Sequence, residues 1–127
     1  MRLILVRHAE AAPGQPDEQR PLTAAGLEAA RALADRIAAQ SPSAVLSSPL
    51  LRARQTATPI ADAAGVGVEV DHRLAPGADA EAVRAVVAGR GDVVVVVGHE
   101  PDCSDIVRAV TGDDVRFPPG GSHDLEL

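Results

Sequence analysis

The five consecutive valines from Val93 to Val97 constrain the fold more than any other segment of this sequence. Valine is β-branched and favours strands, and a strand that is apolar at every position is typical of a parallel sheet covered by helices on both faces. Shorter apolar segments at residues 3–6, 44–47 and 68–70 are interpreted as further strands. Stretches with helical spacing of apolar residues separate them. This alternation predicts a single-domain α/β fold, with a doubly wound, mostly parallel sheet flanked by helices.

Four helices are predicted between these strands. The first begins after Thr23, a typical N-cap residue, and the second ends at Gly65, which suits the left-handed conformation of a helix C-terminus. Pro59 lies inside the second helix and removes a backbone donor, so a kink or a split is expected there. The helices are predicted near residues 24–40, 52–64, 80–90 and 101–111, and an edge strand is predicted at 122–127.

Composition limits the classes of partner and compartment. A chain of 127 residues with 46% hydrophobic residues is expected to form one domain over residues 1–127. A net charge of −6, with no Trp or Tyr, argues against a nucleic-acid partner, because nucleic acids are bound by basic surfaces and aromatic stacking. No apolar run has the length of a membrane span or a signal-peptide core, and the single Cys103 excludes an internal disulfide. We therefore expect a cytoplasmic protein with no membrane partner.

Polar clusters follow three of the predicted strands. Residues 7–10, with the sequence Arg-His-Ala-Glu, follow the first strand, and residues 98–101, Gly-His-Glu-Pro, follow the valine run. The third cluster is the segment 48–56, Ser-Pro-Leu-Leu-Arg-Ala-Arg-Gln-Thr, after the second strand. The carboxyl ends of parallel strands meet at the edge where open α/β sheets bind ligands. The three clusters are therefore predicted to form one site.

The residue types in these clusters favour phosphate chemistry. Phosphoryl transfer needs a nucleophile and positive charge around the phosphate oxygens. Arg7 and Arg52 keep their charge and can hold oxygens in bidentate fashion, and His99 can donate a further hydrogen bond. His8 is the candidate nucleophile, since a neutral imidazole has a free lone pair and adjacent guanidiniums lower its pKa. The same side chains supply the positive charge, so no metal ion and no cofactor are expected.

Other polar residues are interpreted as structural or solvated. Arg54 is expected to point away from Arg52 on its helix. Cys103 is interpreted as a small buried residue and not as a zinc ligand with the two histidines, because no second cysteine or carboxylate stands at zinc-ligand spacing. The residues expected to be exposed to solvent are Asp17, Glu18, His72, Asp113, Asp114 and His123.

The three clusters together resemble those of the histidine phosphatase (phosphoglycerate-mutase-like) superfamily, and the likeness extends over residues 1–111. Pro21-Leu22-Thr23 with Gly26 is also similar to that family's entry into its first helix. Within the family, the chain resembles the short bacterial branch, the SixA-type phosphohistidine phosphatases. The gap between residues 70 and 93 has no room for the insertion that closes over sugar phosphates in longer members.

The resemblance implies that His8 becomes transiently phosphorylated and that Arg7, Arg52 and His99 complete the phosphate pocket. The chain departs from the family pattern at Ala9, where glycine is usual, in its internal helix proline, and in ending almost at its last strand. The first departure concerns how closely the backbone at that turn approaches a phosphate.

No residue is singled out by pattern as a general acid. Glu10, Asp79, Glu81 and Glu100 are the candidates for protonating a leaving alkoxide. Glu10 is also predicted to contribute to substrate binding, and an alternative role is an ion pair that orients Arg7 or Arg52. A phosphohistidine substrate depends less on a general acid, because an imidazole leaving group can already carry its proton. This favours cleavage of a P–N bond.

The leading hypothesis is a metal-independent phosphatase that acts through phospho-His8 on a phosphorylated protein of the histidine-phosphotransfer type. One alternative is a small-molecule phosphomonoesterase, which a deep, lidded pocket would favour. A second is a non-catalytic module that binds phosphorylated ligands, and the intact set Arg7, His8, Arg52 and His99 argues against it. Mutase activity is not favoured, because re-orienting a phosphorylated intermediate needs an enclosed site.

Overall fold

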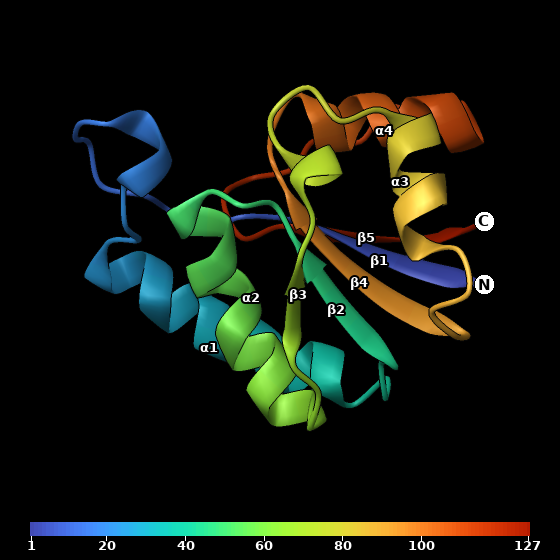
Figure 1. Cartoon of the computed structure of the whole chain (residues 1–127), viewed down its shortest axis with the longest axis horizontal. Coiled ribbons are helices and arrows are strands. Elements are labelled where there is room, and N and C mark those ends of the chain that lie inside the picture. Colours follow the sequence, from blue (N-terminus) through green and yellow to red (C-terminus); the bar gives the residue numbers. More distant parts are fainter.

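The computed structural model describes every residue from Met1 to Leu127 and confirms the predicted α/β class (Figure 1). All the predicted strands and helices are present, with two additional short turns of 3₁₀-helix. In chain order the elements are β1 (Arg2–Arg7), η1 (Asp17–Gln19), α1 (Ala24–Ala38), β2 (Ala44–Ser47), α2 (Leu51–Ala64), β3 (Val68–Val70), η2 (His72–Leu74), α3 (Ala80–Val87), β4 (Val93–Gly98), α4 (Asp102–Thr111) and β5 (Ser122–Glu126).

The five strands form one sheet in the order β3-β2-β4-β1-β5. β1, β2, β3 and β4 run parallel, and β5 pairs antiparallel with β1, as expected for an edge strand. The chain leaves β1 for a helix on one face of the sheet and leaves the adjacent β4 for a helix on the other face (Figure 1). A reversal of this kind between neighbouring strands opens a crevice at their carboxyl ends. β1 and β4 are the strands that His8 and His99 directly follow.

Two hydrophobic cores lie on the two faces of the sheet. α1 and α2 cover one face and α3 and α4 the other, as Figure 1 shows. Alternate residues of each strand face opposite sides, so Ile4 and Val6 join the α1/α2 core while Leu3 and Leu5 join the α3/α4 core. The valine run of β4 divides in the same way, which explains why it is apolar at every position.

The helix ends follow the local signals in the sequence. The Thr23 hydroxyl accepts a hydrogen bond from the Gly26 amide, and Gly65 ends α2 with a φ of 73°. α2 runs unbroken through Pro59, so of the predicted kink or split the split does not occur. The fully buried Ile60 and Ala57 pack this helix against the sheet, and this packing outweighs the lost backbone hydrogen bond. No helix combines the length and the apolar character needed to cross a membrane.

Candidate active site

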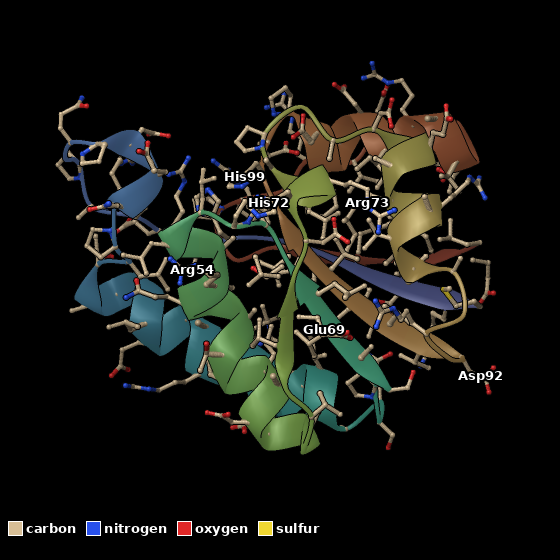
Figure 2. The ribbon with its side chains drawn as sticks, viewed as in Figure 1. Arg54, Glu69, His72, Arg73, Asp92 and His99 are labelled. Atoms are coloured by element: carbon tan, nitrogen blue, oxygen red, sulfur yellow. The ribbon has the colours of Figure 1, made fainter.

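The parallel register of β1 and β4 brings the two clustered histidines together. Arg7 pairs with Gly98 in the sheet, so the next residues, His8 and His99, leave the sheet side by side. Their ring centroids are 5.3 Å apart, and the rings are tilted by 59°. Figure 2 shows His99 near one end of β4 and Asp92 near the other, which places the histidines at the carboxyl edge of the sheet.

Hydrogen bonding determines which nitrogen of His8 is free. Nδ1 lies 2.7 Å from the main-chain carbonyl oxygen of Ala9. A carbonyl can only accept, so Nδ1 carries the proton and donates, and Nε2 of the neutral ring keeps its lone pair. Burial lowers the pKa of His8, the bond to Ala9 opposes this, and the guanidiniums of Arg52 and Arg7 lower it further. His8 is therefore held as a neutral imidazole with Nε2 free.

The turn that carries His8 is fixed from two sides. The buried Thr56 hydroxyl accepts from the Ala9 amide at 3.0 Å and donates to the Arg52 carbonyl at 2.8 Å, so α2 holds the turn. On the other side, the Gly120 amide donates to the His8 carbonyl at 3.0 Å. The Ala9 side chain is fully buried with Leu22 and Ala30, so alanine fits at a position where the family pattern has glycine.

His99 is held by Ser48, a serine of the cluster at residues 48–56. Its Nε2 lies 2.7 Å from Oγ of Ser48, and both side chains are buried. The same hydroxyl oxygen accepts a hydrogen bond from the Leu50 amide at 3.2 Å, and we assign its own proton to the bond with Nε2 of His99. Burial is the main cause that lowers the pKa of His99 to about 4, followed by repulsion between the protonated forms of the two histidines and by the Arg52 guanidinium. This bonding leaves Nδ1 of a neutral His99 as an N–H donor.

Arg7 is anchored to the C-terminal part of the chain. Its Nη1 donates to the main-chain carbonyl of Phe117 at 2.9 Å, and its Nε is buried without a hydrogen-bond partner in the protein. A buried N–H group without a partner is costly, and an anion that accepts from it relieves that cost. The free Nε edge of this guanidinium therefore suits a phosphate oxygen.

Arg52 contacts Asp17, which is exposed as expected but is also bound to the site. Nη2 lies 3.2 Å from Oδ2 of Asp17, and Nη1 donates to the main-chain carbonyl of Asp17 at 2.8 Å. Asp17 also pairs with Arg20 at 3.1 Å. An aspartate three residues before an arginine in a proline-rich loop was the only sequence signal for this arrangement.

The candidate general acids Glu10 and Glu100 form hydrogen bonds with Thr23 and Ser104. Glu10 forms no ion pair with Arg7 or Arg52, because its Oε1 accepts from the Thr23 hydroxyl at 2.8 Å. Both carboxylate oxygens of Glu100 accept from Ser104, one from the amide at 2.8 Å and one from the hydroxyl at 2.6 Å. Glu100 thus caps the first turn of α4.

The two remaining candidate acids, together with Arg54 and Cys103, have positions that are set by the helices and by the hydrophobic core. Asp79 caps α3 by accepting from the Ala82 amide at 2.9 Å, and Glu81 lies exposed on that helix. Arg54 points outward from α2, as expected, and its Nε donates to the Pro49 carbonyl (Figure 2). Cys103 is buried, and burial raises the pKa of its thiol, so it stays protonated.

The two other histidines differ in exposure. His72 lies exposed on η2, as predicted. His123 is half-buried on β5, so its prediction as an exposed residue was wrong. Its ring packs edge to face with Phe117 at a centroid distance of 6.4 Å, because the antiparallel pairing of β5 with β1 brings it inward.

The four site side chains, those of Arg7, His8, Arg52 and His99, lie outside the largest hollow of the surface. That hollow measures about 630 Å³ and lies between α4 and the segment before β5, lined in part by Glu100, Arg108 and Phe117. Arg7, His8 and Arg52 line neither this hollow nor the two smaller ones. The carboxyl edge of the sheet is therefore an open site and not a closed cavity.

Comparison with known proteins identifies the family. The model of the histidine phosphatase superfamily (branch 1) matches residues 3–76, which is more than half of the chain. This chain belongs to the histidine phosphatase superfamily. The matched region contains the clusters with Arg7, His8 and Arg52, and His99 lies beyond it.

Similarity to individual proteins extends over the rest of the chain. A structure of the protein histidine phosphatase SixA with tungstate has a TM-score of 0.88 and 28% identity, covering 100% of this chain and 88% of that one. The SixA protein of Agrobacterium tumefaciens has a TM-score of 0.83 and 31% identity over 98% of this chain and 90% of its own. A Yersinia enterocolitica protein described as "Probable phosphoglycerate mutase GpmB" is 40% identical over 58% of this chain, which spans 37% of that relative's length.

Proposed function

We propose that this protein is a phosphatase that works through a phosphohistidine intermediate on His8 and needs no metal ion. The observation that carries the proposal is the hydrogen bond from Nδ1 of His8 to the Ala9 carbonyl, which leaves Nε2 as a nucleophile. Arg7, Arg52 and His99 gather around this ring with N–H donors that the protein leaves unused. Such donors stabilise the charge that develops on a phosphoryl group in flight.

The reaction divides into two displacements at phosphorus. In the first, the Nε2 lone pair of His8 forms a bond to phosphorus, and the bond to the leaving group breaks with its electrons on that group. In the second, a water oxygen forms a bond to phosphorus, and the P–Nε2 electrons return to His8. Orthophosphate leaves, and the protons of water pass to it and to solvent. Arg7 and Arg52 hold the phosphoryl oxygens in both steps.

The proposed substrate is phosphohistidine on a partner protein of the histidine-phosphotransfer type. An open site admits a residue carried on a protein surface, and both carboxylate oxygens of Glu100 already accept hydrogen bonds from Ser104, so Glu100 is not free to protonate an alkoxide. The similarity to SixA, a protein histidine phosphatase, supports the same choice. Glu10 remains a proposed contact for the substrate at the mouth of the site, through its exposed carboxylate.

A comparison of substrates tests this proposal. We expect kcat/KM for a phosphorylated histidine-phosphotransfer domain to exceed that for every member of a panel of sugar and nucleotide phosphates. The assays are run with and without saturating EDTA, and equal rates are expected, because arginines and histidines supply the positive charge. A small ester whose kcat/KM is a hundredfold higher, about 2.7 kcal/mol of transition-state preference, would establish a phosphomonoesterase activity instead. Rates lost on chelation and restored by zinc or magnesium would overturn metal independence.

Ser48 provides a test of the His99 geometry. Ser48→Ala removes the hydroxyl that bonds to Nε2 of His99. The variant leaves this buried nitrogen without a partner, and the Nδ1–H group of the ring loses its fixed direction. We expect kcat/KM to fall roughly tenfold, since a lost buried hydrogen bond costs about 1–3 kcal/mol. Ser43→Ala is the matched control, because that hydroxyl bonds the Arg90 and Val93 carbonyls at the opposite end of the sheet. A Ser48→Ala rate within twofold of wild type would contradict this role.

A further inference from the structure

Asp17 is the only carboxylate that pairs with a side chain of the proposed phosphate site. Its side chain and its main-chain carbonyl together take two N–H groups of Arg52, one from each terminal nitrogen. Its other oxygen accepts from Nη1 of Arg20, whose Nε is anchored to the Ala12 carbonyl at 2.8 Å. Three anchored contacts fix this carboxylate beside the site.

Arg52 can bind Asp17 and a phosphate at the same time. A guanidinium has five N–H groups, and Asp17 uses two of them, so Nε and the other donors remain for phosphoryl oxygens. The side chain of Arg52 is 9% exposed and that of Asp17 is 59% exposed. The carboxylate therefore lies on the solvent side of the guanidinium, toward which the leaving group of a bound phosphoryl substrate extends.

Asp17 is held in its charged form. Hydrogen bonds from Arg20 and then from Arg52 lower the pKa of its carboxyl group. His99, the other titratable group that interacts with Asp17, is neutral, because burial lowers its pKa to about 4. An ionised carboxylate has no proton to give to an alkoxide, but it accepts a hydrogen bond from a cationic ring.

We propose that Asp17 is a specificity-determining residue that favours phosphorylated imidazole over alkyl phosphomonoesters by binding the protonated distal nitrogen of the substrate ring. This inference rests on the proposed function of the same site. In the step it assists, Nε2 of His8 bonds to phosphorus and the P–N bond of the substrate breaks with its electrons on the substrate nitrogen. The ring leaves as neutral imidazole and keeps the proton on its distal nitrogen, so no proton donor is needed.

The variant Asp17→Asn keeps the shape of the side chain and removes its charge. With free phosphohistidine at pH 8.5, where the substrate ring needs help to hold its proton, kcat/KM is expected to fall about tenfold, the size of one charged hydrogen bond. At pH 6 the loss is expected to shrink, because solution supplies the proton. With 4-nitrophenyl phosphate, whose leaving group needs no proton, the rate stays within threefold at both pH values. Glu18→Gln is the matched control, since Glu18 lies exposed on the same turn and makes no ion pair.

Each other outcome overturns the inference. An equal loss on both substrates at both pH values would mean that Asp17 only positions Arg52. A loss confined to alkyl phosphates such as glycerol phosphate would make Asp17 a proton donor, and unchanged rates on every substrate would remove its role. Failure of the proposed function would be visible separately, because the wild-type protein would then leave phosphohistidine intact. The rates of wild type and Asp17→Asn could still be compared with 4-nitrophenyl phosphate as the substrate.

Discussion

His8→Ala is expected to lower kcat/KM by at least a thousandfold, the largest effect of any single substitution in this protein. The change removes Nε2, the atom that forms the bond to phosphorus, and with it the covalent step. A thousandfold loss corresponds to about 4 kcal/mol of transition-state stabilisation. The measurements are initial rates and the trapping of an acid-labile phosphoenzyme from a ³²P-labelled substrate, which should form with wild type and not with the variant.

His72→Ala is the matched control for this substitution. His72 lies exposed on η2 and forms no hydrogen bond with the four site residues, so its variant should keep full activity and full phosphoenzyme labelling. Circular dichroism should be unchanged for both variants, because the His8 ring lies at the sheet edge and belongs to neither large hydrophobic core. If the activity of His8→Ala is within tenfold of wild type, His8 is not the nucleophile.

The parts of this protein that could be predicted from sequence are those with local signals. The valine run and the segments at residues 3–6 and 44–47 became strands that are buried on both faces, whereas the short segment 68–70 became an edge strand that is largely exposed. The meeting of His8 and His99 was also predictable, although 91 positions separate them, because parallel strands in one sheet end at one edge. The helix ends at Thr23 and Gly65 followed from capping preferences.

The parts that could not be predicted depend on contacts without a local pattern. Arg7 is anchored by the main-chain carbonyl of Phe117, 110 residues away, and a backbone carbonyl has no residue signature. Asp17 reaches Arg52 across 35 residues from a proline-rich loop whose path the sequence does not indicate. Pro59 carries a strong local signal that tertiary packing overrides. Local preference thus places the nucleophile, whereas long-range contacts fix the arginines around it.

Arg52→Lys is expected to produce the second-largest loss, about a hundredfold to a thousandfold in kcat/KM, as for other donors that stabilise transition-state charge. Lysine keeps the charge but presents a single ammonium group in place of a planar fork. It cannot hold the Asp17 carbonyl, the Asp17 carboxylate and phosphoryl oxygens together, as the geometry of Arg52 allows. The loss should appear in kcat as well as in KM, because the charge on the phosphoryl oxygens changes in the transition state.

Arg54→Lys separates this effect from a general loss of positive charge or of helix stability. Arg54 lies two residues further along α2, exposed, with its Nε on the Pro49 carbonyl, so the same chemical change there should leave kcat/KM within twofold. Inorganic phosphate provides a second measurement, since it inhibits by occupying the same donors. Its inhibition constant should rise with Arg52→Lys and stay unchanged with Arg54→Lys. If the two lysine variants lose activity equally, the guanidinium fork of Arg52 does not hold the phosphoryl group, and positive charge near the N-terminus of α2 is sufficient.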